Sequence, residues 1–215
     1  MKITTPEYKI SFKLDEAKDP FSVLIIAHGA GAGMQHSFLE QLAKENCLRG
    51  SHSIRFNFPY MESGRKSPGS PKRNIEAWKV VLDYVRKKYP DLPIFISGKS
   101  YGGRMASHLV VEHNVSVNGI IYFGFPLHAP GRDSKERAAH LSSIEIPQLF
   151  LQGTKDKLAN IELMREVNTE QKEAELVELT GADHSFNVPK RVGISKEEVI
   201  NNLVDQSIKF QKKHS

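Results

Sequence analysis

A serine flanked by glycines stands between a strand-like segment and a helix-like segment. Leu92–Ser97 is a short apolar run of the kind that forms a buried strand, and a helical pattern begins near Met105. Between them Gly98–Gly102 reads GKSYG, the G-x-S-x-G form in which a tight strand-to-helix turn exposes the serine hydroxyl. Both glycines are needed because a Cβ at either position would collide with the neighbouring strand or helix. The spacing predicts that Ser100 is a nucleophile.

The same residues allow two other interpretations. Gly-Lys-Ser also ends the phosphate-binding P-loop, but the first glycine of that motif would fall at Pro93, and the residues between are strand-like. An ordinary strand–turn–helix junction would also carry glycines here, and the motif alone does not exclude it. The remainder of the chain must supply the other groups that a serine nucleophile needs.

An acid and a base follow later in the chain, each just after a predicted strand. Gln148–Gln152 leads into Asp156, and Glu173–Leu179 leads into His184. Because ligands of parallel sheets bind outside the carboxyl ends of the strands, these side chains should lie near Ser100. His184 would accept the serine proton near neutral pH, and Asp156 would fix the imidazole tautomer. Ser…Asp…His is the chain order of the α/β-hydrolase fold.

Two backbone amides are candidates for an oxyanion hole. The amide of Tyr101 lies at a predicted helix N-terminus, and the glycine-rich loop HGAGAG would supply a second amide from Gly29 or Ala30. That loop also suggests a dinucleotide fold. However, Met34 stands where the third glycine belongs, and the next strand carries Arg55 instead of an acidic residue.

Other titratable residues fit the acid and base roles less well. Asp183 adjoins His184 and cannot easily reach round to orient it, and Asp133 lies in a loop before a short predicted helix. Of the nine histidines, most fall in helices, at a strand start or at the tail. His28 precedes the glycine loop, and we expect it to pack against or brace that loop.

Strands alternate with helices along the chain. Predicted strands are Tyr8–Leu14, Phe21–Ala27, Ser53–Phe58, Leu92–Ser97, Val117–Phe123, Gln148–Gln152 and Glu173–Leu179. Predicted helices cover Met34–Leu48, Asn74–Tyr89, the segment after Ser100, a short stretch near Lys135–Leu141, a segment ending near Val167, and the C-terminus from the capping box at Ser195. The polar segment Glu62–Arg73 should be a surface loop. The pattern predicts one α/β domain over residues 1–215, with a mostly parallel sheet of about seven strands and helices on both faces.

Composition excludes several other classes of protein. No apolar run approaches the roughly 20 residues that span a bilayer, and the N-terminus lacks the apolar core of a signal peptide, so we expect a cytoplasmic protein. The net charge of +5 is mild and its Lys and Arg residues are scattered, so nucleic-acid binding is not predicted. The single cysteine, Cys47, cannot form an internal disulfide. No His, Asp or Glu set has zinc-ligand spacing, so no metal or cofactor is expected.

These motifs together resemble the small, capless α/β hydrolases of the dienelactone-hydrolase-like group. The chain is most similar to the hydrolase-like family of bacterial predicted hydrolases, testis-expressed hydrolase-like proteins and a histone-acetyltransferase-complex subunit. The resemblance rests on HGAGAGM (His28–Met34), RFNFPYMESGRK (Arg55–Lys66), GKSYGGRMAS (Gly98–Ser107), FGFPLHAPG (Phe123–Gly131), LQGTKD (Leu151–Asp156) and GADHSF (Gly181–Phe186). It implies a Ser-His-Asp hydrolase fold but no settled substrate. Dienelactone hydrolases proper use cysteine where this chain has Ser100, so their lactone substrate is not carried over.

The sequence therefore favours a serine hydrolase, of carboxylesterase or thioesterase type, that cleaves a small ester or thioester through an acyl-serine intermediate. The segment between the fifth and sixth predicted strands is too short for a full cap domain, so the pocket should be open. We expect substrate contacts from Tyr60, Arg65, Arg104, Phe125, His128 and Phe186. The cationic residues would suit an anionic substrate, and ordinary solvated loop charges explain them equally well. The alternative is a hydrolase-fold module that binds a partner without catalysis. The protein should be a monomer or a homodimer.

Overall fold

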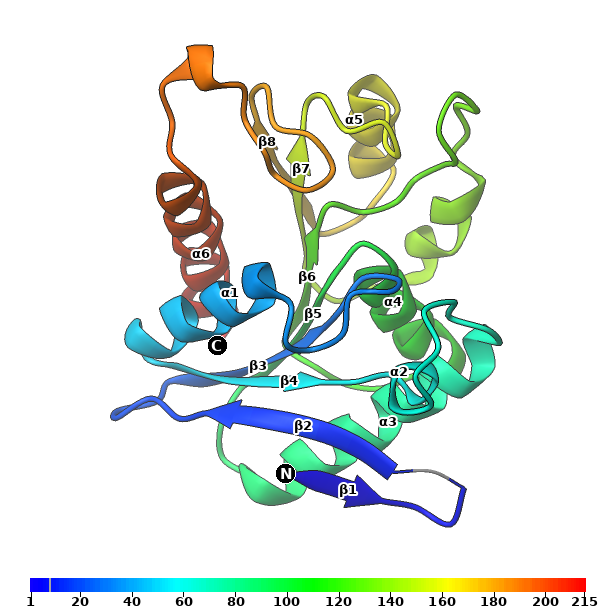
Figure 1. Cartoon of the computed structure of the whole chain (residues 1–215), viewed down its shortest axis with the longest axis vertical. Coiled ribbons are helices and arrows are strands. Elements are labelled where there is room, and N and C mark those ends of the chain that lie inside the picture. Colours follow the sequence, from blue (N-terminus) through cyan, green and yellow to red (C-terminus); the bar gives the residue numbers. More distant parts are fainter. Residues whose placement is uncertain (8) are drawn as a thin grey trace.

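The computed structural model describes residues 1–7 and 9–215, which form one eight-stranded sheet with helices around it (Figure 1). The strands are β1 (Lys2–Thr4), β2 (Lys9–Asp15), β3 (Ser22–Ala27), β4 (Ser51–Phe56), β5 (Ile94–Lys99), β6 (Gly119–Phe123), β7 (Gln148–Gly153) and β8 (Ala174–Leu179). The helices are α1 (Ser37–Leu48), α2 (Pro59–Glu62), α3 (Pro71–Lys88), α4 (Tyr101–His113), α5 (Ile161–Thr169) and α6 (Lys196–Lys213), with 3₁₀ helices η1 (Glu136–Ser143) and η2 (Lys190–Val192).

The strand order is β1-β2-β4-β3-β5-β6-β7-β8. From β4 to β8 in this order every neighbouring pair is parallel, whereas β2 runs antiparallel to β4, and β1 antiparallel to β2. The predicted α/β class and mostly parallel sheet are confirmed. The eighth strand is β1, whose three residues are too few for an alternating pattern to be visible in the sequence.

Helices cover both faces of the sheet (Figure 1). Alternate residues of β3 are divided between two cores: Val23 and Ile25 pack with α3 and α4, whereas Leu24 and Ile26 pack with α1 and α6. All six residues of β3 are buried, as its continuous apolar run predicts for a central parallel strand. This arrangement leaves the strand ends, and the loops that follow them, as the exposed places where a site can form.

Several element boundaries differ from the sequence predictions. The strand β4 ends at Phe56 instead of residue 58, because Pro59 starts the short helix α2. The helix α3 begins at Pro71 and not at Asn74, since proline favours the first position of a helix. The strand β5 continues to Lys99, so Ser100 follows it directly. Tyr8, the first residue of one predicted strand, lies outside the described residues.

The turn from β5 to α4 brings three backbone segments into direct contact. Ser100 has φ 52° and ψ −117°, a conformation that costs a non-glycine residue about 1–3 kcal/mol. A Cβ on Gly98 would overlap backbone atoms of Gly103 and Gly102. A Cβ on Gly102 would lie 2.6 Å from the carbonyl oxygen of His28. The two glycines of the motif are therefore required by backbone contact on both sides of Ser100.

The glycine-rich loop after β3 is held against this turn by a buried histidine. His28 Nε2 accepts a hydrogen bond from the Phe58 amide at 3.1 Å, and Nδ1 lies 2.7 Å from the Gly29 carbonyl oxygen. Accepting at Nε2 requires a neutral ring with its proton on Nδ1. Burial lowers the His28 pKa to about 4, which favours the same neutral form. His28 thus braces the loop, as expected.

The other end of the loop is fixed by a buried arginine. Arg55 in β4 donates to the carbonyl oxygen of Met34 at 2.8 Å and pairs with Asp15 and Glu40 at 3.3 Å each. The Met34 amide also donates to Asn57 Oδ1 at 2.8 Å. Both ends of the loop are therefore anchored before any ligand binds.

The segment between β6 and β7 contains only the 3₁₀ helix η1, so the structure has no separate cap domain. The edge of the sheet that carries Ser100 is consequently open to a ligand.

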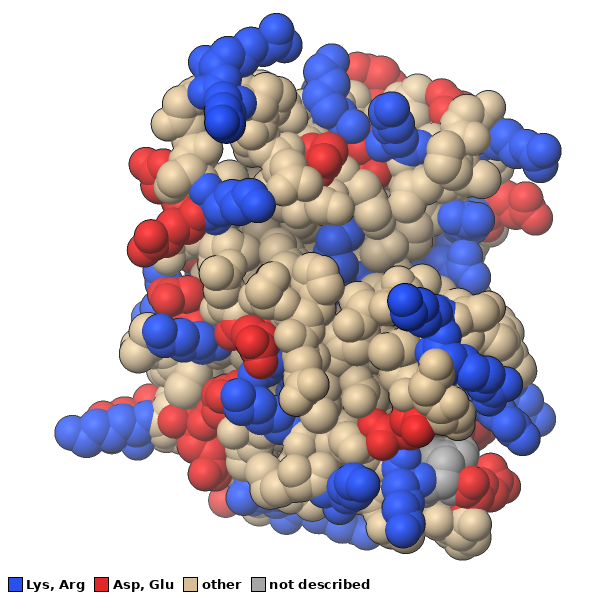
Figure 2. Space-filling model, viewed as in Figure 1, with Lys and Arg blue, Asp and Glu red and all other residues tan. Residues whose placement is uncertain are grey.

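Within the described residues, no helix combines the length and the apolar character needed to cross a membrane. Lys and Arg side chains are distributed around the face shown in Figure 2, with Asp and Glu between them.

We predict that Gly98→Ala destabilises the fold by about 3 kcal/mol or more, because its Cβ meets backbone that cannot move aside. The matched control is Gly131→Ala. Gly131 has a positive φ of 70°, which disfavours any side chain, but nothing lies within 4 Å of the added Cβ. The Gly131→Ala substitution should therefore cost only about 1–2 kcal/mol. Urea denaturation measures both. Equal losses would contradict the packing argument.

Candidate active site

A continuous chain of hydrogen bonds joins three side chains at the carboxyl edge of the sheet. His184 Nε2 lies 2.9 Å from Ser100 Oγ, and His184 Nδ1 lies 2.6 Å from Asp156 Oδ2. The three residues come from the loops after β5, β7 and β8, which are separated by up to 84 residues in sequence. The structure thus brings together the predicted nucleophile, base and acid.

The carboxylate of Asp156 is buried, and both of its oxygens take part in hydrogen bonds. Besides the imidazole, Oδ2 accepts from Gln152 Nε2 at 2.6 Å, and Oδ1 accepts from the Leu158 amide at 2.7 Å. Donors on both oxygens stabilise the ionised carboxylate and prevent it from rotating. An ionised, fixed Asp156 holds His184 with its proton on Nδ1 and leaves Nε2 free to accept a proton from Ser100.

The loop that carries His184 is shaped by its neighbour Asp183. Asp183 Oδ1 accepts from the amides of Ser185 and Asn187 at 2.8 and 2.9 Å, which closes the loop on itself. The loop also lies directly against β7, because a Cβ on Gly153 would overlap the carbonyl of Ala182. Asp183 therefore positions the loop and does not contact the imidazole, in agreement with the sequence argument.

Backbone amides lie on the other side of Ser100. Tyr101 is the first residue of α4, so its N–H has no acceptor within the helix. In the glycine loop, the amide of Gly31 donates to Tyr60 Oη at 3.4 Å, and that of Ala32 donates to Gly29 O at 3.3 Å. This leaves the amides of Gly29 and Ala30 as the loop's candidates for binding an oxyanion.

A cavity of about 330 Å³ opens beside the serine. Its lining combines the candidate site with apolar side chains from α1 and from the loop after β7: Gly29, Ala30, Ala32, His36, Phe38, Leu39, Lys99, Ser100, Leu158, His184 and Ser185. Pockets for small ligands range from roughly 300 to 1,000 Å³, so this cavity is at the small end. It is large enough for a small ligand only.

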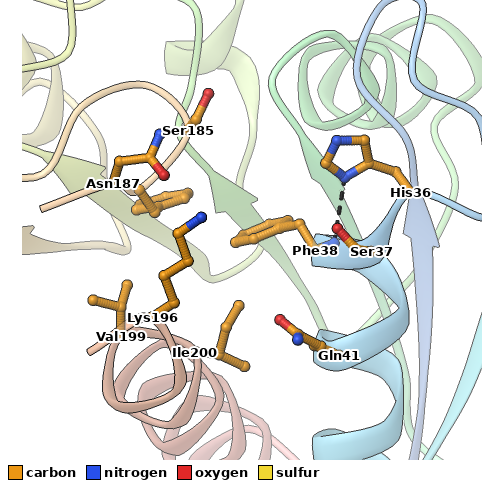
Figure 3. A pocket seen from close by; sticks show the side chains of 10 residues that line it. His36, Ser37, Phe38, Gln41, Ser185, Asn187, Lys196, Val199 and Ile200 are labelled. Carbon is orange, nitrogen blue, oxygen red and sulfur yellow. Dashed lines mark hydrogen bonds between the residues drawn. The ribbon is translucent and has the colours of Figure 1, made fainter.

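A second cavity of about 200 Å³ adjoins the first and shares His36, Phe38 and Ser185 with it. Figure 3 shows this cavity between α1 and the start of α6, with Lys196 and Ile200 on one side and Gln41 on the other. The ring of Phe38 is stacked on that of Phe186, with centroids 5.5 Å apart. Phe38 lines both cavities, and Phe186 lines the second one.

None of the six residues that we expected to contact substrate lines the cavity beside Ser100. Phe125 is in the core, packed on Tyr122 and Phe150. His128 is buried and accepts from the Asn160 amide at 2.8 Å. Both follow β6, but their side chains turn inward and fill space under η1 and the loop after β7. A position after a strand does not decide the direction of a side chain.

The two arginines that we expected to contact substrate, Arg65 and Arg104, lie away from the cavity beside Ser100. Arg65 lines a separate cavity of about 670 Å³ between α2 and α3, which it shares with the predicted contact residue Tyr60. Tyr60 is buried, and burial raises its pKa to about 12, so it stays neutral and supports the glycine loop through Gly31. Arg104 lies on α4 near Arg137 and His108. Phe186 lines the adjoining cavity of about 200 Å³ and stacks on Phe38, which lines both cavities.

Several residues of the site were not singled out from the sequence. Gln152 is a buried polar residue next to the end of β7, directly after the apolar run Leu149–Leu151, a signal that could have identified it as a partner of Asp156. Lys99 stands inside the serine motif at a position the motif leaves open. Phe38 and Leu39 belong to the apolar face of α1, and nothing in their spacing distinguishes a cavity wall from the core.

Solved structures with the same fold come from several bacteria. An alpha-beta serine hydrolase homologue from Coxiella burnetii is 22% identical with a TM-score of 0.77, covering 96% of this chain and 95% of its own. A dienelactone hydrolase from Anabaena variabilis is 14% identical with a TM-score of 0.80, covering 100% and 96%. A serine hydrolase without a lid from Xanthomonas campestris is 16% identical with a TM-score of 0.74, covering 96% and 93%.

At these identities the structures establish the fold alone. The family model described as "Alpha/beta hydrolase domain" matches residues 20–212 of the sequence, which include every strand from β3 to β8 and all three hydrogen-bonded side chains. The chain belongs to the alpha/beta hydrolase family.

Proposed function

We propose that Ser100, His184 and Asp156 form a catalytic triad that hydrolyses a small ester or thioester through an acyl-serine intermediate. The observation that carries the proposal is the unbroken hydrogen-bond chain from Asp156 through His184 to Ser100 Oγ, at 2.6 and 2.9 Å. A neutral serine needs such a base within hydrogen-bond reach to act as a nucleophile.

In the acylation step, Ser100 Oγ attacks the carbonyl carbon of the substrate while its proton moves to His184 Nε2. Asp156 stabilises the resulting imidazolium without taking its proton. The negative charge on the former carbonyl oxygen is met by the amide of Tyr101 and by that of Gly29 or Ala30. The imidazolium then gives its proton to the leaving alcohol or thiol, and the acyl group remains on Ser100.

In the second step, a water molecule gives a proton to His184 and attacks the acyl carbonyl. The carboxylic acid leaves and Ser100 recovers its proton. The open edge of the sheet admits this water, because η1 is the only helical element between β6 and β7. The cavity of about 330 Å³, largely apolar, suits a short acyl chain better than a long one.

We expect Ser100→Ala to abolish turnover of short-chain p-nitrophenyl esters and thioesters, with a loss on the order of 10⁶ in kcat. The variant should keep its fold, because the change removes one oxygen and leaves the backbone contacts of the turn as they are. A fluorophosphonate probe should label the parent protein at Ser100 and leave the variant unlabelled. Steady-state kinetics and intact-protein mass spectrometry provide the two readouts.

The matched control is Ser142→Ala, which removes an exposed hydroxyl on η1 and should retain full activity and labelling. A folded parent protein that neither turns over these substrates nor labels would refute the hydrolase proposal. It would favour the alternative of a binding module that keeps the hydrolase fold without its chemistry.

We expect Asp156→Asn to lower kcat by about 10⁴. The amide would donate to His184 Nδ1, so the ring proton would move to Nε2, where it blocks acceptance of the serine proton. Asp133→Asn is the control with the same chemical change. Asp133 accepts from Asn160 Nδ2 at 2.6 Å and lies near His128, away from His184. It should alter kcat by less than about threefold, and the reverse ranking would move the acid role to Asp133.

A further inference from the structure

One charged group next to Ser100 has no partner. The Nζ atom of Lys99 is buried and makes no hydrogen bond within residues 1–7 and 9–215. Lys99 lines the same cavity as Ser100 and His184. A Cβ built on Gly124 would lie 3.1 Å from Lys99 Nζ and 3.7 Å from His184 Cε1, so the ammonium and the imidazole flank one point of the chain. The cation therefore lies beside the proposed reaction centre.

The neighbouring carboxylates do not neutralise this ammonium by direct contact. Asp156 and Asp183 are the acidic groups that favour its charge. The oxygens of Asp156 are bonded to His184, Gln152 and the Leu158 amide. Those of Asp183 are bonded to the Ser185 and Asn187 backbone amides and to the Asn187 side chain. The ammonium of Lys99 therefore has no direct carboxylate partner among the described residues.

Burying an unpaired ammonium is unfavourable. Accordingly, burial lowers the Lys99 pKa to about 8, which still leaves the side chain mostly charged at neutral pH. Packing of the stem against Gly29 and a 5.5 Å contact between Nζ and the ring of Phe186 account for part of the arrangement. A methionine would provide the same apolar contacts without a charge, so packing gives no reason for an ammonium here.

We propose that Lys99 is a specificity-determining residue that binds a carboxylate of the substrate. The natural substrate is then a short ester or thioester that carries a carboxylate a few carbons from the scissile carbonyl. This inference rests on the proposed hydrolase function and adds the substrate class. The carboxylate would form the charge-assisted hydrogen bonds that Lys99 otherwise lacks, in a cavity whose apolar wall strengthens them.

The placement favours a short substrate. Lys99 and Ser100 are consecutive, so their Cα atoms are about 3.8 Å apart. Both residues also line one cavity of about 330 Å³, so an anion at Lys99 and a carbonyl at Ser100 would belong to the same small substrate. The carboxylate could stand on the acyl part or on the leaving group. The chemistry that Lys99 recognises is the same in both cases, and the experiment below separates them.

The test compares three esters of similar size. Ethyl hydrogen glutarate carries the carboxylate on the acyl part, 2-carboxyethyl pentanoate carries it on the leaving group, and ethyl pentanoate is neutral. Proton release at constant pH measures kcat and KM for each. At pH 7 the parent protein should prefer one of the charged esters by roughly 10- to 100-fold in kcat/KM over the neutral ester, the range for a hydrogen bond to a charged group.

Lys99→Met should remove this preference, because it should lower kcat/KM for the preferred charged ester roughly 10- to 100-fold more than kcat/KM for ethyl pentanoate. Lys157→Met is the control, because it removes an equal charge from an exposed position in the loop that carries Asp156. It should leave the preference intact. His36→Gln tests the other wall residue that could carry a positive charge, and it should also preserve the preference.

The pH dependence gives a readout that does not depend on any variant's folding. The ratio of kcat/KM for the preferred charged ester to that for the neutral ester should fall as pH rises through about 8, because Lys99 loses its proton there while the substrate carboxylate stays ionised. The other titratable groups around the ammonium are Asp156, Asp183, His184 and His36. Those that serve the chemistry act on both esters and cancel in the ratio.

The outcomes separate this inference from the proposed function. Ser100-dependent turnover with no preference for either charged ester, or with equal losses for all three esters in Lys99→Met, would overturn the role of Lys99 and leave the hydrolase proposal standing. A ratio that does not change with pH would overturn it as well. Absence of turnover and of Ser100 labelling would instead refute the hydrolase proposal on which the inference rests.

Discussion

The close backbone contact at the turn after β5 is the constraint on which the site depends. At Gly98 the strand lies directly against the first turn of α4, and at Gly102 the helix lies directly against the carbonyl groups at the end of β3. Three backbone segments meet with no room for a Cβ, which forces Ser100 into its strained conformation. These contacts are made by backbone atoms and not by side-chain rotamers, so the backbone itself positions the serine hydroxyl.

Hydrogen bonding divides the charged and polar groups around the serine into two kinds. Asp156 and His28 are buried with every relevant atom bonded, which fixes one protonation state and one orientation for each. Lys99 is buried with its ammonium unbonded. In a medium of low polarity, a satisfied group stabilises the fold and an unsatisfied one costs free energy. The groups that we propose to support the chemistry have all their hydrogen bonds, and the one that we infer to bind substrate does not.

The walls of the cavity come from elements on one side of the sheet. Phe38 and Leu39 belong to α1, and Phe38 stacks on Phe186 from the loop that also carries His184. The loop beyond β6, from which we expected substrate contacts, instead packs inward through Phe125 and His128. Without a cap domain, the shape of the cavity depends on α1 and on the loops after β7 and β8. The serine itself is held independently by the β5–α4 turn.

The sequence by itself determined the α/β class and the mostly parallel sheet, and it pointed to Ser100, Asp156 and His184 as the three side chains that the structure joins by hydrogen bonds. It could do so because period-two and continuous apolar runs locate strands, and because strand ends of a parallel sheet share one edge. Only the tertiary structure decided which side chains face the cavity. Phe125 and Lys99 both stand next to strand ends, yet Phe125 turns into the core and Lys99 toward the serine. The direction of a side chain at or beyond a strand end depends on contacts with residues far away in the chain, and local patterns carry no information about them.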